Sequence, residues 1–332
     1  MKGVALGLLC LSASSSTAYD FMGPVVAPRR GENATVESMA AHYDAPACRA
    51  AIAASWRRYR WNATCPRFSS QQALVLSLSG RRSVWVRDQK AASRMLWNDL
   101  AVIAGADASK VRVPYGNASG FARYAAPDAF VPEDGDFVWT TIREPAAKAL
   151  SGYAEILLKK TTNKLAVPWA VKDGAHTRNF ANFLEVLATA ANLGDEAMHA
   201  WPMAILLDVV PRRGARRYDA MARVENLDDE LRRVLALAGA QSFNEVAMEE
   251  FRHSHAQKKT TTKVTPGHTR LMRLFCKLYQ VDYVCFPAYS PPRACVDADP
   301  NFLRRWHRRG TADHAAAPAG SSAGGGGGRE RS

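Results

Sequence analysis

The sequence predicts an α/β fold in which a parallel sheet is flanked by helices, and three observations lead to it. The chain has 332 residues, 47% of them hydrophobic and 23% charged, which suits one large domain with a buried core. Short apolar, β-prone runs alternate with stretches in which apolar residues recur at helical spacing. Strands that alternate with helices are typical of parallel sheets with helices on both faces. Ligands of such folds bind beyond the carboxyl ends of the strands.

The individual elements follow from these patterns. Strands are predicted at residues 83–86, 137–142 and 219–225. Helices are predicted at residues 46–59, 91–104, 146–159, 180–191, 227–238 and 269–279. The helix at 146–159 follows Pro145, and proline favours the beginning of a helix. The resulting order alternates strands and helices within one domain, which we expect to span residues 71–314.

The two ends of the chain differ from the middle in composition. Residues 1–18 are typical of a secretory signal, with Lys2 followed by a short apolar run and then small residues up to Ala18. The apolar run is far shorter than the roughly 20 residues that span a bilayer, although an uncleaved short anchor stays open. We expect residues 19–70 to form a lumenal stem. The Gly, Ala and Ser residues of 315–332 predict a disordered tail.

Sequons and cysteines agree with a lumenal address. N-x-Ser/Thr sequons begin at Asn33, Asn62 and Asn117. Beyond the signal segment there are five cysteines, which an oxidising compartment would favour as disulfides. Proximity in sequence favours a Cys48–Cys65 pair, and the other pairings stay open. No C-x-x-C spacing occurs, so no structural metal site is predicted. We expect the secretory pathway, in the Golgi lumen or membrane, with secretion as the alternative.

The net charge of +13, from 44 Lys and Arg against 31 Asp and Glu, favours polyanionic partners. Sulfated glycans, anionic membranes, nucleic acid and phosphorylated cofactors all fit such a charge, and so does a merely soluble basic surface. Neither zinc-finger spacing nor an aromatic and basic RNA-binding motif is found, so nucleic acid is not expected. A membrane partner is expected only if the N-terminal segment is uncleaved.

The first motif is the turn that joins the predicted strand 83–86 to the helix after it. Free backbone N–H groups and the helix dipole make such a turn an anion site, and small residues let a phosphate approach. The glycines of a Walker A loop are absent. A lysine on a solvated surface is the alternative interpretation. The candidate residues are Lys90, Ala91, Ala92, Ser93 and Arg94.

The second motif follows the predicted strand 137–142. Arg143 leaves the end of the strand, and Ser151 lies in the next helix. The planar guanidinium suits a phosphate, and the serine hydroxyl is suited to complete the contact. The alternative is a structural ion pair of Arg143 with Glu144 or Glu155.

Together, the two motifs resemble those of PAPS-dependent sulfotransferases, most closely the Golgi carbohydrate sulfotransferases. Ile142-Arg143-Glu144-Pro145 with Leu150-Ser151-Gly152-Tyr153 matches the family's 3′-phosphate motif, and Lys90-Ala91-Ala92-Ser93-Arg94 resembles its 5′-phosphosulfate loop more loosely. Gln89 stands where the family usually has proline, and Ser93 replaces its threonine. The resemblance implies a sulfotransferase fold with a P-loop-like sheet. It also implies PAPS as the donor co-substrate, Lys90 at the transferred group, and Arg143 and Ser151 at the 3′-phosphate.

Downstream segments extend the resemblance over residues 75–290. His199-Ala200-Trp201-Pro202 resembles the His-Trp-x-Pro segment of chondroitin-type enzymes, and 218–231 and 278–286 resemble later segments. The implied activity is transfer of a sulfuryl group to a hydroxyl of an acceptor that we expect to be a glycan and that can itself be anionic. His199 is the favoured catalytic base, while a carboxylate or another histidine stays open: His176, His253, His255 or His268.

Two other classes of protein remain as alternatives at this stage. One is a secreted, basic polyanion-binding protein with a degenerate sulfotransferase fold and no catalysis. The other is a phosphoryl-transfer enzyme, which needs Mg²⁺ ligands and a Walker-like loop, and neither is found in the sequence.

Overall fold

A computed structural model describes most of the predicted domain. The described ranges are residues 34–59, 73–88, 122–125, 133–162, 180–189, 199–208, 217–249 and 269–303, with Ala91, Ala92 and a few positions of 96–104. The signal (1–18), the tail (315–332), the three sequon asparagines, Cys65 and the four alternative histidines lie outside them.

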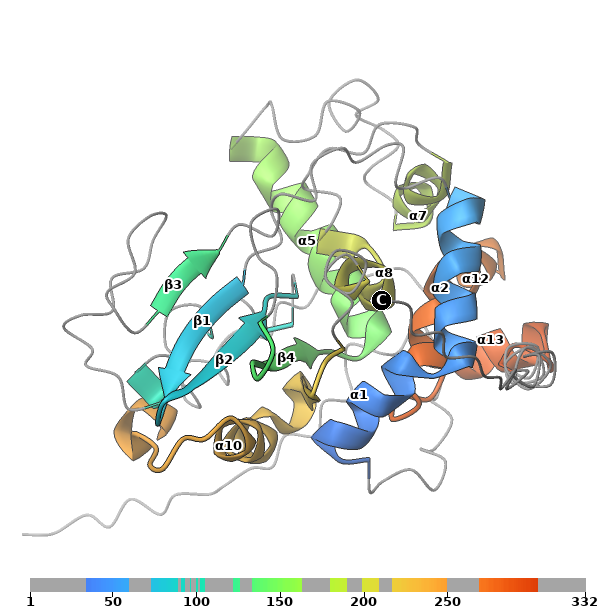
Figure 1. The fold of residues 1–332 in the computed structure, drawn as a ribbon. Coiled ribbons are helices and arrows are strands. Elements are labelled where there is room, and N and C mark those ends of the chain that lie inside the picture. The colour runs from blue at the N-terminus through green and yellow to red at the C-terminus, as the bar shows by residue number, and fades with distance from the viewer. Residues whose placement is uncertain are drawn as a thin grey trace, which may run out of the picture.

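A five-stranded mixed sheet forms the centre of the fold, with the strand order β3-β1-β2-β4-β5 (Figure 1). Its middle and one edge are parallel: β2 pairs with β4, and β4 pairs with β5, in parallel register. The strands are β1 (Ala73–Leu78), β2 (Arg81–Val86), β3 (Ala122–Ala125), β4 (Phe137–Ile142) and β5 (Ala220–Arg223).

The predicted fold class is confirmed, and the sheet adds an antiparallel edge that the patterns did not reveal. Strand β1 pairs antiparallel with both β2 and β3. The two residues that connect β1 to β2, Ser79 and Gly80, have φ values of 47° and 81°. Positive φ at both positions of a two-residue loop is the geometry that matches the twist of a β-hairpin, so β1 turns back along β2.

Helices cover both faces of the sheet. Val138 and Ile142 of β4 pack into one core cluster with α1, α2, α5, α8 and α12, whereas Trp139 packs into a second cluster with α10. The alternation of side chains along β4 therefore gives the sheet two buried faces. The helices are α1 (Val36–Asp44), α2 (Pro46–Tyr59), α5 (Pro145–Thr162), α7 (Phe180–Thr189), α8 (Met203–Leu207), α10 (Leu227–Leu237), α12 (Thr269–Cys285) and α13 (Arg293–Ala298), with a 3₁₀ turn at Val224–Asn226. Where the structure describes the chain, no helix is long and apolar enough to cross a membrane.

Helices α1 and α2 correct the predicted stem over the part of 19–70 that they occupy. Tyr43 of α1 donates a hydrogen bond of 2.9 Å to the backbone oxygen of Ala204, and Trp56 of α2 donates one of 2.9 Å to Asp208. Both aromatic side chains are buried in the main core cluster. Residues 36–59 are thus part of the folded domain, because α1 packs on β5 and α2 packs on α12 and α8.

The disulfides correct the predicted Cys48–Cys65 pair. Cys48 bonds to Cys285, 237 residues away, and Cys276 bonds to Cys295, 19 residues away. Packing of α2 against α12 brings Cys48 to the end of α12, and proximity in sequence could not show this.

Removal of the two disulfides is expected to have unequal effects. A cross-link restricts the unfolded chain more as the closed loop lengthens, so Cys48→Ala/Cys285→Ala should lower the free energy of unfolding by about 5 kcal/mol and Cys276→Ala/Cys295→Ala by about 3 kcal/mol. Urea unfolding measures both losses in free energy, in a buffer that neither reduces the remaining disulfide nor oxidises free thiols. Equal losses, or a larger loss from the short loop, would contradict the loop-length account.

Candidate functional site

The candidate site lies where β2, β4 and β5 end. These strands are parallel, so the segments that follow them open on one edge of the sheet. Asp88 and the turn at Ala91–Ala92 follow β2, Arg143 and Glu144 follow β4, and the 3₁₀ turn Val224–Asn226 follows β5. Motifs that are far apart in sequence therefore meet at this edge.

The segment after β2 is a tight turn that leads into helical backbone. The N–H of Ala91 donates to the oxygen of Asp88 at 3.4 Å, and the N–H of Leu96 donates to the oxygen of Ala92 at 3.1 Å. Ala91 is fully buried, and Ala92 has a φ of 56°. The predicted turn with small residues is present, and Lys90, Ser93 and Arg94 lie outside the described residues.

The left-handed conformation of Ala92 leads to a stability prediction. The Cβ of an L-residue is crowded at positive φ and glycine is not, so Ala92→Gly should raise the free energy of unfolding by about 1 kcal/mol. Ala91→Gly is the matched control: Ala91 is not among the positive-φ residues, and loss of its buried methyl group should destabilise the protein. Urea midpoints measure both variants. A destabilised Ala92→Gly protein would show that the Ala92 methyl group contributes more than its backbone strain.

Hydrogen bonds join the turn after β2 to the end of β4. The hydroxyl of Thr141 donates to the backbone oxygen of Ala91 at 2.7 Å, and that of Thr140 donates to the oxygen of Val86 at 2.7 Å. Both threonines are fully buried, so these bonds are shielded from water. They fix the first motif relative to the second.

A buried ion pair adds a further link between the two motifs. The ammonium of Lys148, on α5, lies 3.5 Å from a carboxylate oxygen of Asp88 and donates to the backbone oxygen of Trp201 at 2.8 Å. Asp88 and Lys148 are both fully buried, and desolvation lowers the pKa of Lys148. This pair was not predicted from the sequence. The signal in the sequence was a lysine on the apolar face of the helix after one strand, together with an aspartate just after another strand.

Asp282, on α12, holds the segment that follows Trp201. Its two carboxylate oxygens accept hydrogen bonds from the N–H groups of Met203 and Ala204, at 3.0 and 2.8 Å. These groups begin α8, and a carboxylate at a helix N-terminus satisfies its free donors. Complete burial raises the pKa of Asp282 to about 7. Asp282 is therefore placed as a structural cap.

The start of α5 is fixed by a pair of glutamates. Glu144 accepts the N–H of Ala147 at 2.6 Å and the hydroxyl of Tyr283 at 3.0 Å, one on each carboxylate oxygen. The N–H of Glu144 in turn donates to Glu225 at 2.8 Å. Burial, with the charge of Glu225 as a smaller cause, raises the pKa of Glu144 to about 7. Pro145 is the first residue of the helix, one position before the predicted start.

Arg143 lies just before α5, and Ser151 lies within it. The N–H of Arg143 donates to the sulfur of Met203 at 3.1 Å, and its side chain is partly exposed at the carboxyl edge of the sheet. Ser151 lies in the second turn of α5 and is also partly exposed. Both side chains are thus accessible to a ligand.

Gly152 explains how the His199 segment reaches α5. A Cβ at Gly152 would lie 2.3 Å from the backbone oxygen of His199 and 2.9 Å from the Cα of Ala200. Only glycine allows the two backbones to approach so closely. His199 is partly buried and lies next to the turn of α5 that carries Ser151. The structure therefore places the predicted base beside the second motif.

The arrangement suits a polyanionic ligand. It combines a tight turn before a helix, the guanidinium of Arg143 and the hydroxyl of Ser151 along one edge of the sheet. Within the described ranges, no cluster of three or more His, Cys, Asp or Glu side chains is placed to hold a metal ion.

Comparison with models of protein families finds a match to the sulfotransferase family. The model of the sulfotransferase family matches residues 130–290, a range that includes β4, α5, the His199 segment and β5. No curated protein and no solved structure matches the chain. The match supports assignment to the sulfotransferases and, with it, sulfuryl transfer in general. A non-catalytic polyanion-binding protein is not favoured.

Proposed function

We propose that this chain transfers a sulfuryl group from PAPS to a hydroxyl of a glycan. The observation that supports it most is the meeting of the two motifs at the carboxyl edge of the sheet. Thr141 and Ala91 are 50 residues apart in sequence and are joined by a hydrogen bond of 2.7 Å. A donor with phosphates at both ends needs two anion sites at a fixed separation, and this contact, with the Lys148–Asp88 pair, fixes it.

The residues present fit the chemistry of PAPS. The nucleotide carries phosphates at the 3′ and 5′ positions, and each needs N–H donors or cations. The turn at Ala91–Ala92 lies just before helical backbone; Ala91 is buried and Ala92 is half-buried, and their small side chains leave room for a phosphate. Arg143, just after β4, and Ser151, on α5, supply a second set of donors.

Each residue has a distinct role in this proposal. Arg143 and Ser151 hold the 3′-phosphate and thereby position the donor. Lys90, with the main chain of Ala91, Ala92, Ser93 and Arg94, holds the 5′-phosphate. Negative charge grows on the departing oxygen during transfer, so a cation held there stabilises the transition state more than the ground state.

His199 is the proposed general base, which removes the proton from the acceptor hydroxyl. A neutral imidazole accepts a proton near physiological pH. Glu144, whose pKa is about 7, is the carboxylate alternative. Both of its oxygens already accept hydrogen bonds that hold α5 and Tyr283, so its position favours a structural role.

The acceptor and the compartment complete the proposal. A glycan acceptor, which can itself be anionic, accords with the net charge of +13. Two disulfides fit an oxidising compartment, and we place the protein in the secretory pathway, in the Golgi or secreted. The test is transfer of radiolabelled sulfate from PAPS to a panel of desulfated glycans. Transfer to a glycan supports the proposal. Binding of PAP without transfer to any glycan would contradict the glycan acceptor and indicate a hydroxyl compound of another class.

Substitution of His199 tests the base. His199→Ala should lower kcat by about 10²- to 10⁴-fold, the usual contribution of general base catalysis, while PAP affinity stays unchanged. Glu144→Gln is the comparison: it removes the carboxylate, keeps one oxygen to accept the N–H of Ala147, and turns an NH2 donor toward the oxygen of the Tyr283 hydroxyl. A large loss of kcat in Glu144→Gln, with little loss in His199→Ala, would transfer the role to the carboxylate.

A further inference from the structure

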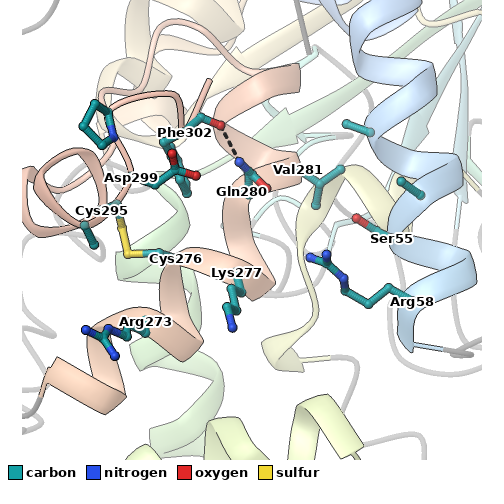
Figure 2. A pocket seen from close by; sticks show the side chains of 14 residues that line it. Ser55, Arg58, Arg273, Cys276, Lys277, Gln280, Val281, Cys295, Asp299 and Phe302 are labelled. Carbon is teal, nitrogen blue, oxygen red and sulfur yellow. Dashed lines mark hydrogen bonds between the residues drawn. A yellow bond between two sulfur atoms is a disulfide. The ribbon is translucent and has the colours of Figure 1, made fainter. Parts of the chain in front are cut away.

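A pocket lies away from the carboxyl edge of the sheet, between α2, α12 and the chain around α13. Figure 2 shows its lining, and its volume is about 520 Å³. Arg58 comes from α2, while Arg273 and Lys277 come from one face of α12, and all three side chains are exposed. The volume is within the range of pockets that bind small ligands.

This pocket is separate from the candidate donor site. Arg273, Lys277 and Gln280 follow one another at helical spacing on the face of α12 that lines the pocket. Asp282 lies on the opposite face, where it binds the start of α8. Helix α12 thus has one face toward the buried centre of the domain and another toward the pocket.

The walls of the pocket are held in place by covalent and hydrogen bonds. The Cys276–Cys295 disulfide ties α12 to α13, and the amide of Gln280 donates to the backbone oxygen of Phe302. On the other side, the hydroxyl of Tyr59 donates to the backbone oxygen of Lys277 at 3.0 Å. A ligand therefore meets a largely preformed site, which reduces the entropy lost on binding.

The charges that line the pocket favour an anion. Arg58, Arg273 and Lys277 stand against one lining carboxylate, that of Asp299. One oxygen of this carboxylate accepts the N–H of Asn301 at 3.0 Å, so Asp299 also serves to shape the turn after α13. The excess of cations in one concave site raises the local concentration of anionic groups.

We propose that this pocket is a second binding site, for the sulfate or carboxylate groups of an anionic polysaccharide. Single-stranded nucleic acid is another common polyanion, and it is bound by exposed aromatic rings as well as cations. The aromatic side chain in the lining, Phe302, is only 4% exposed and offers no stacking surface. The disulfide in the wall fits oxidising compartments, where the abundant polyanions are glycans.

The site goes beyond the proposed function, because it would hold a polysaccharide without PAPS. Its role would be to retain an anionic chain next to the enzyme while a hydroxyl elsewhere on that chain, or on another one, reacts. Binding at two places on one chain raises the effective concentration at the second.

The test measures affinity for a fluorescent heparin-derived oligosaccharide by anisotropy, with the full chain and without PAPS. Arg58→Ala/Arg273→Ala/Lys277→Ala should bind about tenfold more weakly, since three exposed charge contacts are lost. Arg49→Ala/Arg57→Ala/Arg293→Ala removes the same charge from exposed residues outside the lining and is the matched control. The affinity of this control for the oligosaccharide should fall by less than about twofold.

Further arms separate the outcomes. Arg58→Lys/Arg273→Lys/Lys277→Arg keeps the charges and should retain most of the affinity. Equal losses in the pocket and control triple variants would overturn the proposal, because net charge alone would then explain binding. Pocket-dependent binding of a single-stranded oligonucleotide, tighter than that of the saccharide, would also overturn it. Saturating PAP should not displace the saccharide from the pocket. Binding of PAP is measured in a separate titration, so a negative result for the saccharide does not bear on the proposed donor site.

Discussion

Replacement of Arg143 by alanine is expected to weaken PAP binding by roughly a hundredfold or more while the protein stays folded. A guanidinium that binds a phosphate through two charge-assisted hydrogen bonds contributes several kcal/mol when its site is sheltered, and alanine removes both bonds. The contact of Arg143 with the sulfur of Met203 should survive, because it comes from the backbone N–H of Arg143, which alanine retains. Isothermal titration calorimetry with PAP measures the affinity.

Two variants sharpen this experiment. Arg217→Ala removes an exposed arginine that pairs with Asp44 at 3.4 Å, away from the site, and should leave PAP affinity unchanged. Arg143→Lys keeps the charge without the planar fork and should give an intermediate affinity. If Arg143→Ala binds PAP as tightly as the unaltered protein, the second motif does not hold the nucleotide.

Replacement of Gly152 by alanine is expected to destabilise the protein by about 3 kcal/mol or more. The added Cβ would lie 2.3 Å from the oxygen and 2.7 Å from the carbonyl carbon of His199, and backbone atoms cannot move aside as a flexible side chain does. The two segments must separate, which also displaces the proposed base. We therefore expect a lower urea midpoint and a lower kcat together.

Ala147→Ser is a suitable control for the glycine substitution. It adds one heavy atom to the same helix at a partly exposed position and should change the free energy of unfolding by less than about 0.5 kcal/mol. Normal stability in Gly152→Ala would show that α5 and the His199 segment are not in close contact.

Local patterns predicted the elements that carry the two motifs. Strand β4 has the predicted bounds because it is a short apolar run rich in aromatic and β-branched residues, and α2 has them because its buried residues recur at helical spacing. Helix α5 begins at Pro145, one residue before the predicted start, because the fixed φ of proline suits the first position of a helix. The close approach at Gly152 was not predicted, since it depends on a partner segment 47 positions along the chain whose path no local pattern gives.

Long-range contacts account for what sequence could not show. The antiparallel edge is completed by β3, which pairs with β1 from more than 40 residues away, whereas the Ser79–Gly80 turn is a local signal that had not been used. The Cys48–Cys285 bond joins positions that only the packing of α2 on α12 brings together. The buried Asp88–Lys148 pair is similar, because each charge alone looks like an exposed surface residue until its burial is known.

The most direct test of the central claim is thermal unfolding of the full chain with increasing PAP, compared with AMP, at low salt. A ligand that binds only the native state raises the melting temperature as its concentration increases, by about 2.7 kcal/mol of stability at a hundredfold excess over Kd. PAP and AMP differ in the 3′-phosphate that Arg143 and Ser151 are proposed to hold. We predict a rise with PAP and little or none with AMP. No rise at millimolar PAP, or an equal rise with both nucleotides, would contradict a PAPS site at the carboxyl edge of this sheet.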